Sequence, residues 1–155
     1  MKDLNTYITE KLKIRKTSHS YKYFPKTKEE LQDILKQLIK KRGNDGDFND
    51  IDTSEIIDMS YLFVGMKDLL KIDVSYWDVS NVISTDNMFR GCINLEKIIG
   101  IENWDVSNVE NMKDMFRGCE SFNQDISKWD VSKVTNKSCM FFYCPIEEKY
   151  KPKFK

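Results

Sequence analysis

The side chains best suited to chemistry in this chain are four cysteines, one histidine and a recurring aspartate. Thiolates, imidazoles and carboxylates are the usual zinc ligands, and the same groups act as nucleophiles and bases in enzymes. The cysteines form no Cys-x-x-Cys pair, and His19 has no acidic partner at a recognisable spacing. A Gly-rich phosphate-binding loop is also missing from the sequence. The sequence therefore predicts no zinc site, no enzyme activity and no cofactor.

The cysteines fit a repeating pattern better than a reactive site. Cys92, Cys119 and Cys144 occupy the same position of successive repeats, where the first repeat has Met66. A position shared by Met and Cys calls for a medium-sized apolar side chain. Cys139 lies outside this column, at a position where we expect a more exposed thiol. Because the sequence shows no export signal, we expect all four thiols to be reduced.

The aspartates belong to the same repeat. Trp77, Trp104 and Trp129 each begin the phrase Trp-Asp-Val-Ser, and Ile51 begins a cruder copy, so the spacings are 26, 27 and 25 residues. Asp and Ser side chains bond to nearby backbone groups where a chain turns. A calcium-binding ladder is the alternative, but the Gly-rich nonapeptide turns of calcium-binding repeats are missing. We therefore expect the repeated Asp to cap turns.

The apolar spacing within one repeat predicts the elements that hold these side chains. The gaps over 109–119 are three, three, one and three, as on one face of a short helix. Ser107 and Glu110 form a capping box at its start, and Gly118 lies near its end. Residues 122–127 are too few and too polar for a helix and suit an extended segment. Each repeat is thus predicted to be a strand, a turn, a short helix and a turn.

Four such repeats lead to the fold prediction. One repeat has too few apolar side chains to offset the entropy of ordering its backbone, whereas stacked repeats share a core. We expect an α/β solenoid, a leucine-rich-repeat-like right-handed stack of about four short strand-turn-helix coils with an N-terminal helical cap. The expected parts are the cap at 1–46, the four repeats at 47–144, and a closing segment with a tail at 145–155, in one compact unit.

The cap is predicted from one strong helix signal. Thr27 and Glu30 form a capping box, Leu and Ile recur at gaps of three and one over 31–39, and Gly43 suits the helix end. We expect the apolar stripe to cover the open end of the first repeat. A groove-filling contact with a partner protein is the alternative. A second short helix is expected at 4–14.

The repeat phrase WDVSNVENMKDMFRGCESFNQDISKWDVS resembles the BspA-like leucine-rich-repeat family, which includes a bacterial and mycoplasmal surface-protein repeat of unknown function. The resemblance covers residues 47–144. It implies a right-handed solenoid that binds proteins or host surfaces, with no catalytic residues to carry over. The flanking segments are similar to those of small bacterial and phage versions of the repeat, which hints at a phage or mobile-element gene.

Charge is uneven along the chain although its total is zero. Residues 1–43 hold 12 Lys or Arg against 5 Asp or Glu, a balance of +7, and the remainder holds 13 against 20, a balance of −7. A basic head can attract nucleic acid, but a basic helix face is more often simply solvated, so nucleic acid is not the expected partner. The sequence shows no signal peptide, lipid-attachment motif or transmembrane run. We expect a cytoplasmic monomer, in the host cytoplasm if the gene is phage encoded.

Binding is the function that remains. We expect a non-catalytic protein-binding module that acts inside the cell, directed at a host defence or regulatory protein if the gene belongs to a phage. An adhesin-like surface-binding module and a self-associating structural protein stay open as alternatives. The candidate partner-binding residues are positions that differ between repeats on the strand side, with two arginines as a second patch: Asp73, Tyr76, Glu102, Asn103, Asn123, Gln124, Asp125, Lys128, Arg90 and Arg117.

Overall fold

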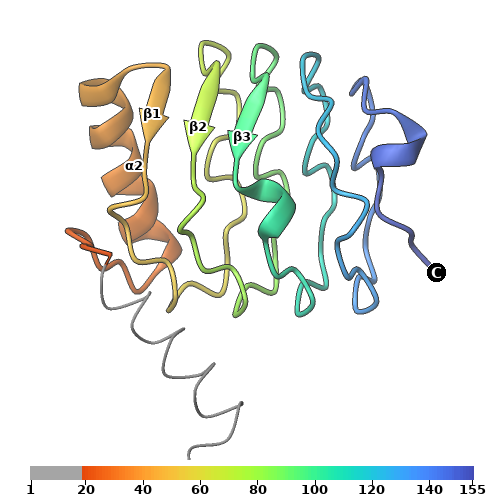
Figure 1. Cartoon of the computed structure of the whole chain (residues 1–155), viewed down its shortest axis with the longest axis horizontal. Helices are drawn as coiled ribbons and strands as arrows, with labels where there is room; N and C mark the ends of the chain where they lie inside the picture. Colours follow the sequence, from red (N-terminus) through yellow and green to blue (C-terminus); the bar gives the residue numbers. More distant parts are fainter. Residues whose placement is uncertain (1–18) are drawn as a thin grey trace, which may run out of the picture.

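A computed structural model describes residues 19–155 of the chain (Figure 1). The regular elements in this part are α2 (Lys28–Arg42), β1 (Asp45–Asp47), β2 (Lys71–Asp73), β3 (Lys97–Ile99) and the short 3-10 turns η1 (Ile101–Asn103) and η2 (Glu148–Tyr150). The short helix expected at 4–14 lies outside the described residues. No helix within 19–155 combines the length and the apolar character needed to cross a bilayer.

Helix α2 begins and ends where its capping residues predict. The Thr27 hydroxyl accepts a hydrogen bond from the Glu30 N–H (3.2 Å), and the Glu30 carboxylate accepts one from the Lys26 N–H (2.7 Å). Gly43 has a φ of +80°, and its N–H donates to the Ile39 carbonyl (2.8 Å). A glycine adopts this backbone conformation at little cost, so the helix stops here.

The apolar face of α2 packs against one end of the repeats (Figure 1). Leu31, Leu35 and Leu38 are buried and belong to the same core as the repeats. Lys28 reaches the first repeat, where its ammonium donates to the Asp58 carboxylate (2.9 Å) and the Ser60 hydroxyl (3.2 Å). The stripe therefore covers this end of the core, as predicted, and does not fill a partner's groove.

Strands β1, β2 and β3 form a parallel sheet in that order. The register pairs Gly46 with Ile72, and Ile72 with Ile98. The two isoleucines are buried. Gly46 has no side chain because the Phe48 ring occupies that space: a Cβ built on Gly46 would lie 2.5 Å from the ring. A larger residue at position 46 would push Phe48 out of the core.

The predicted fold class is wrong. Within residues 19–155 the structure has one α-helix and one small, open, three-stranded parallel sheet, and not the α/β solenoid of four strand-turn-helix coils. The helix expected over 109–119 is a series of turns, and the segment 122–127 is not a strand. The Glu110 N–H donates to the Ile83 carbonyl (2.8 Å) and not to the Ser107 hydroxyl, so the Ser107–Glu110 capping box does not form.

The backbone explains why these short helices are absent. A helix needs negative φ throughout and a bond from each N–H to the carbonyl four residues earlier. The N–H groups of Met112, Asp114 and Phe116 donate instead to carbonyls of the following repeat, at 2.8, 2.9 and 3.0 Å. Asp114 and Gly118 have φ of +53° and +71°. Apolar gaps of three and one therefore fit these turns as well as they fit a helix.

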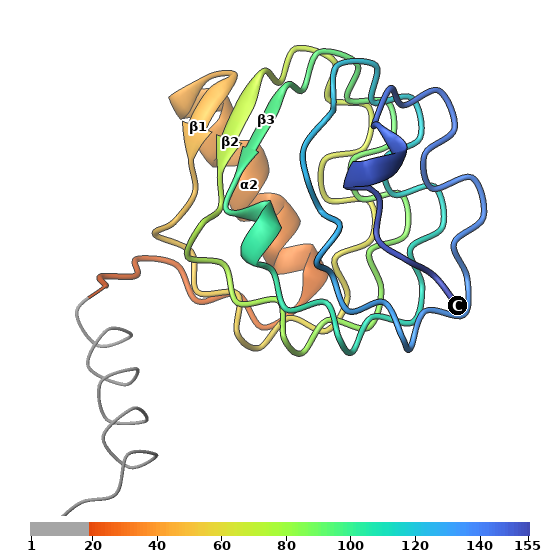
Figure 2. The same cartoon turned by 45° about the vertical axis from the view of Figure 1, so that its right-hand side comes forward.

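The register of the repeats is confirmed. Trp104 stacks on Trp77 and on Trp129, with 6.4 Å between ring centroids in each pair. A column of phenylalanines stacks in the same way at separations of 5.3, 5.6 and 5.9 Å: Phe63, Phe89, Phe116 and Phe141. Successive repeats lie side by side in both views (Figures 1 and 2). Like side chains thus meet like in one core that extends from Leu31 to Ile146.

The three tryptophans differ in one contact. The indole N–H groups of Trp77 and Trp129 donate to the carbonyls of Phe48 and Ile101, each at 3.0 Å. The Trp104 indole N–H is buried and has no acceptor among the described residues. The interval from Trp77 to Trp104 is also the longer one, at 27 residues against 26 before it and 25 after it, and η1 lies directly before Trp104.

Candidate functional site

Asp73, the first strand-side candidate, is used to hold the chain together. It ends β2, and one of its carboxylate oxygens accepts from the Ser75 N–H (3.1 Å), the Ser75 hydroxyl (2.7 Å) and the Asn49 amide (2.8 Å). Burial acts to raise the pKa of Asp73, but the bonds from Ser75 and Asn49 outweigh it and leave the pKa below its ordinary value. The ionised carboxylate is thus already engaged within the protein.

Tyr76 lies beside the N-terminal head. Its side chain is exposed, and its ring stacks on the His19 ring with 4.0 Å between centroids and 7° between planes. The Tyr76 N–H donates to the Asn49 side chain (2.8 Å), and His19 Nε2 lies 2.6 Å from the Asn49 carbonyl oxygen. Tyr76 and His19 therefore anchor the head to the end of the first repeat, which gives His19 a structural role.

Two further candidates join neighbouring segments through their amides. Gln124 accepts from the Ile98 N–H (2.6 Å) and donates to the Ile98 carbonyl (3.2 Å), as the backbone of a fourth strand would do. Asn123 accepts from the Glu147 N–H (2.9 Å) and donates to the Glu147 carboxylate (3.1 Å). Gln124 thus ends the sheet at β3, and Asn123 holds the C-terminal segment.

The remaining strand-side candidates are exposed. Glu102 and Asn103 lie in η1, and Asp125 and Lys128 lie in the next repeat. The Asp125 carboxylate accepts from the Ser127 N–H (2.9 Å), and hydrogen bonding to Ser127 lowers the Asp125 pKa. The structure therefore does not join the strand-side candidates into one continuous free surface, because bonded residues separate the free ones.

The two arginines belong to a row that crosses the repeats. The carbonyls of Arg90, Arg117 and Phe142 each accept a backbone hydrogen bond of 2.7 or 2.8 Å from a glycine of the preceding repeat. That glycine directly follows the residue of its own repeat that is equivalent to the acceptor. These bonds bring four residues side by side, and we call them the arginine row: Val64, Arg90, Arg117 and Phe142.

Both arginines of this row are held in place. Arg90 donates to the Asn87 side chain (3.1 Å), and Arg117 donates to the Asp114 carboxylate (3.2 Å). The Arg117 guanidinium also lies 5.3 Å from the centre of the Phe142 ring. Side chains that are already ordered lose less conformational entropy when a partner binds. The row is therefore a preorganised surface.

Sequence reasoning missed the apolar side chains of this region. Tyr61 and Val64 belong to one turn and are 45% and 42% exposed, and Phe142 is 47% exposed at the other end of the arginine row. Ile57 and Ile83 are also exposed and are joined by a backbone bond of 2.8 Å. The available signal was the change of residue type within the column of Val64, Arg90, Arg117 and Phe142; the column of Tyr61 changes type as well, yet its Asn87 and Asp114 are buried.

Cys92 and Cys119 have the buried environment and Cys139 the exposed one that their columns predict, whereas Cys144 is only partly buried. Cys92 and Cys119 are buried, and their thiols donate to the carbonyls of Phe63 (2.9 Å) and Phe89 (3.0 Å). Burial raises the pKa of Cys92 to about 12 and also raises that of Cys119. Cys139 is exposed. Within residues 19–155, no three side chains of His, Cys, Asp or Glu come together as metal ligands would.

Comparison with known proteins gives one match. Residues 21–151 match the model of a family described as "Mycoplasma protein of unknown function, DUF285". No curated protein matches the chain, and no solved structure matches it.

Proposed function

The chain belongs to the DUF285 family of Mycoplasma proteins, which has no known function to carry over, and we propose from the geometry that it is a non-catalytic protein-binding module. The arginine row carries the proposal. Arginine and aromatic side chains are enriched where proteins bind one another, and here Arg90 and Phe142 are exposed and Arg117 is partly exposed on an ordered backbone. The likeness of the repeat phrase to BspA-like proteins, which implies the binding of proteins or host surfaces, supports the same role.

A catalytic role has little support from the reactive side chains. The Cys92 and Cys119 thiols are buried, and burial raises their pKa, so the nucleophilic thiolate is even less populated at neutral pH than for an exposed cysteine. His19 is stacked on Tyr76 and lies against the Asn49 carbonyl. We also propose that the module acts inside the cell, because all four cysteines are free thiols and disulfides are favoured outside it.

Quantitative co-purification from a mycoplasma lysate tests the binding proposal. The bait is the full chain, compared with Arg90→Gln/Arg117→Gln, which removes both charges but keeps an amide donor near Asn87 and Asp114. The matched control is Glu102→Gln/Lys128→Gln, a double change of exposed charges on the strand side. We expect a partner that the wild type and the control retain and that the arginine variant loses by at least about tenfold.

Thermal unfolding of the three baits shows whether each variant is folded. A set of captured proteins that is the same for all three folded baits would contradict the proposal for the arginine row. Loss of the partner only with the Glu102/Lys128 control would show that the contact surface lies on the strand side.

A further inference from the structure

In each repeat, a run of turns such as the one from Thr85 to Phe89 bonds to the neighbouring repeats, and we call this run a turn row. The hydrogen-bonding groups along the edge of the last turn row differ from those along the edge of a strand. In each earlier row, the N–H groups of alternate residues donate to the next repeat, as Thr85, Asn87 and Phe89 do at 2.9 to 3.0 Å. The carbonyls of those same residues are used locally, because each accepts the N–H three residues later. On the side that faces the C-terminal end, a turn row therefore presents a run of donors, preceded by one acceptor, the carbonyl of Ile57, Ile83 or Glu110.

The fourth repeat leaves such a row open. The equivalent donors are Lys137, Cys139, Phe141 and Tyr143, and no carbonyl among the described residues accepts from them. The carbonyls of Lys137, Cys139 and Phe141 accept from Met140, Phe142 and Cys144, at 3.1 to 3.2 Å. We call these four N–H groups the donor edge. An ordinary strand edge alternates donors and acceptors, whereas this edge carries donors alone.

The surroundings of the donor edge are basic. Residues 137–155 hold five lysines against two glutamates. Lys151 is paired with Glu148 and Lys149 with Glu147, which leaves three lysine charges in excess: Lys137, Lys153 and Lys155. Backbone N–H groups in a row, with positive φ at alternate turns, form concavities that favour anions. The φ of Cys139 and of Tyr143 is +55°.

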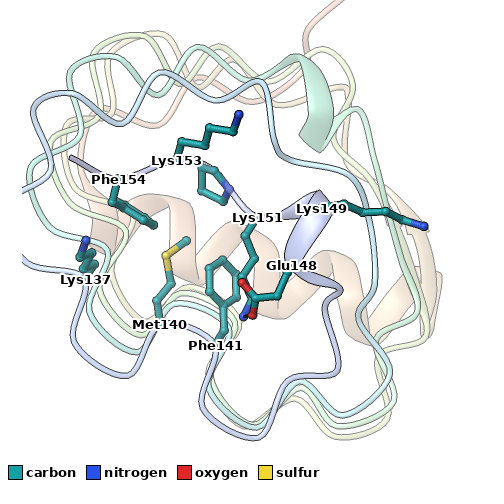
Figure 3. Close-up of a pocket in the computed structure, with 9 residues that line it drawn as sticks. Lys137, Met140, Phe141, Glu148, Lys149, Lys151, Lys153 and Phe154 are labelled. Carbon is teal, nitrogen blue, oxygen red and sulfur yellow. Dashed lines mark hydrogen bonds and ion pairs between the residues drawn. The ribbon is translucent and has the colours of Figure 1, made fainter.

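A hollow of about 510 Å³ lies between this row and the C-terminal tail (Figure 3). The side chains of Met140, Phe141 and Phe154 point toward one another in it, while Lys149 and Lys153 point away. Phe141 is the last ring of the phenylalanine column, and Phe116 stacks on one side of it. The Lys151 ammonium lies 5.6 Å from the centre of the Phe141 ring, so an aromatic side chain that entered the hollow would meet this ammonium at the end of the column.

We propose that the donor edge and the adjacent hollow bind an extended acidic segment of a partner protein that carries an aromatic residue. The interior of the molecule shows how such a segment would bind. In each earlier repeat, the N–H groups of the turn row donate to alternate backbone carbonyls of the following repeat. A segment of about seven residues offers four such carbonyls. Its carboxylates would face the lysines, and its aromatic ring would enter the hollow.

A second copy of the chain fits this edge less well. The acceptor side of the first row, where a head-to-tail copy would dock, is covered by α2. That helix carries Lys36, Lys40 and Lys41 on its exposed side, so two basic ends would meet.

Amide hydrogen exchange and NMR titration of the full chain test the proposal. In the free protein we expect the four donor-edge amides to exchange rapidly, while Met112, Asp114, Phe116 and Gly118, their bonded equivalents, are protected. The probe is an end-capped nine-residue peptide of Asp and Glu with one central Phe. Its addition should shift the four donor-edge amides together and slow their exchange by at least about tenfold.

Charge reversal supplies the matched variants. Lys137→Glu at the edge should raise the Kd of the peptide at least about tenfold, whereas Lys113→Glu, the same change in the preceding repeat, should leave it within about twofold. Arg90→Gln/Arg117→Gln should also leave this Kd unchanged, so the donor edge and the arginine row are tested separately.

Several results would overturn the proposal. Peptide shifts outside residues 137–143, or equal affinity for Lys137→Glu and wild type, would remove the edge as the site. Tighter binding of inorganic phosphate or of a DNA oligonucleotide at the same amides would assign the edge to another ligand class. Light scattering that shows a concentration-dependent dimer, lost in Lys137→Glu, would assign it to a second copy.

Discussion

At the residue scale, the three tryptophans have similar surroundings but differ in one hydrogen bond. Comparing them therefore measures what that bond contributes to the free energy of unfolding. Each is 5% exposed and each stacks on another tryptophan, but only Trp77 and Trp129 have an acceptor for the indole N–H among the described residues. A buried donor without an acceptor costs about 1–3 kcal/mol. We therefore expect Trp104→Phe to lower the free energy of unfolding by about 1 kcal/mol less than Trp129→Phe. Urea denaturation of both variants measures this, and equal losses would show that Trp104 is satisfied.

The buried thiols predict a loss of stability in alkali. Burial raises the Cys92 pKa from 9.0 to about 12, so the unfolded chain ionises first. The contribution of the buried Cys92 thiol to the free energy of unfolding is complete below about pH 9. It is lost as the pH rises toward about 12, at about 1.4 kcal/mol per pH unit.

Urea denaturation between about pH 8 and about pH 10.5 measures this slope. Cys92→Ala should make the decline of the unfolding free energy shallower, because one ionising thiol is removed. Cys139→Ala is the control, since its thiol is exposed. If both alanine variants decline as steeply as the wild type, buried thiols do not control alkaline stability.

Burial could be predicted from the residues that recur in the repeat columns. The backbone conformation of the strained turns could be predicted much less well. Trp, Phe and Cys recur at fixed spacings, and their burial follows from that recurrence. Positive φ at Asn87 and Asp114 suits residues that tolerate the left-handed region. Tyr61 and Tyr143 adopt the same conformation, although Tyr has no preference for it. Bonds to neighbouring repeats impose this geometry, and composition does not reveal them.

At the scale of elements, one ion pair fixes the end of α2 to the chain that follows. Arg42 in the last helical turn donates twice to Asp50, at 2.7 and 2.9 Å, and both side chains are mostly buried. The hydrogen bond from Arg42 holds the pKa of Asp50 below its ordinary 3.8. The stabilisation is therefore present above about pH 4 and is lost as the pH falls through the lowered pKa.

We expect Asp50→Asn to lower the unfolding free energy by about 1–3 kcal/mol at neutral pH and by less in acid. Denaturation at about pH 7 and about pH 3 measures both values. Asp33→Asn is the control, because its pair with Lys36 is exposed and spans 3.8 Å, so we expect almost no change. A cost for Asp50→Asn that stays constant with pH would contradict the role of this ion pair.

The end of the sheet depends on a side chain. Gln124 bonds to both backbone groups of Ile98 on the outer side of β3. Gln124→Ala removes both bonds, so we expect the Ile98 amide to exchange at least about tenfold faster while the Ile72 amide in β2 is unaffected. Exchange NMR measures both sites, with Asp125→Ala as the neighbouring control. An unchanged Ile98 rate would mean that water or backbone replaces the amide.

Elements with local signals were predictable, and those fixed by contacts between repeats were not. Helix α2 has its own caps and an apolar stripe within 15 residues. The turn rows have apolar gaps of three and one as well, but their N–H groups bond to the following repeat and not back along a helix. The sequence holds no sign of that choice, because both arrangements bury the same side chains.

At the scale of the whole molecule, the register of the repeats was predictable and the fold class was not. The similar spacing of Trp77, Trp104 and Trp129, at 27 and 25 residues, correctly predicted their contact. It could not predict which secondary structure joins them. The strand-side candidates were chosen as variable polar positions, and the structure uses Asp73, Gln124 and other members internally. Arg90 and Arg117 remain a testable prediction as binding residues.

Most of the hydrogen bonds between turn rows run in one direction, and this has an electrical consequence. In each row, alternate peptide groups direct N–H toward the following repeat and C=O toward the preceding one. A peptide group carries about 3.5 D, and aligned groups add head to tail. The protein therefore has a macrodipole along its length although it contains only one long helix in 19–155. Its negative pole faces Lys28, and every added repeat would extend the separation of the two poles.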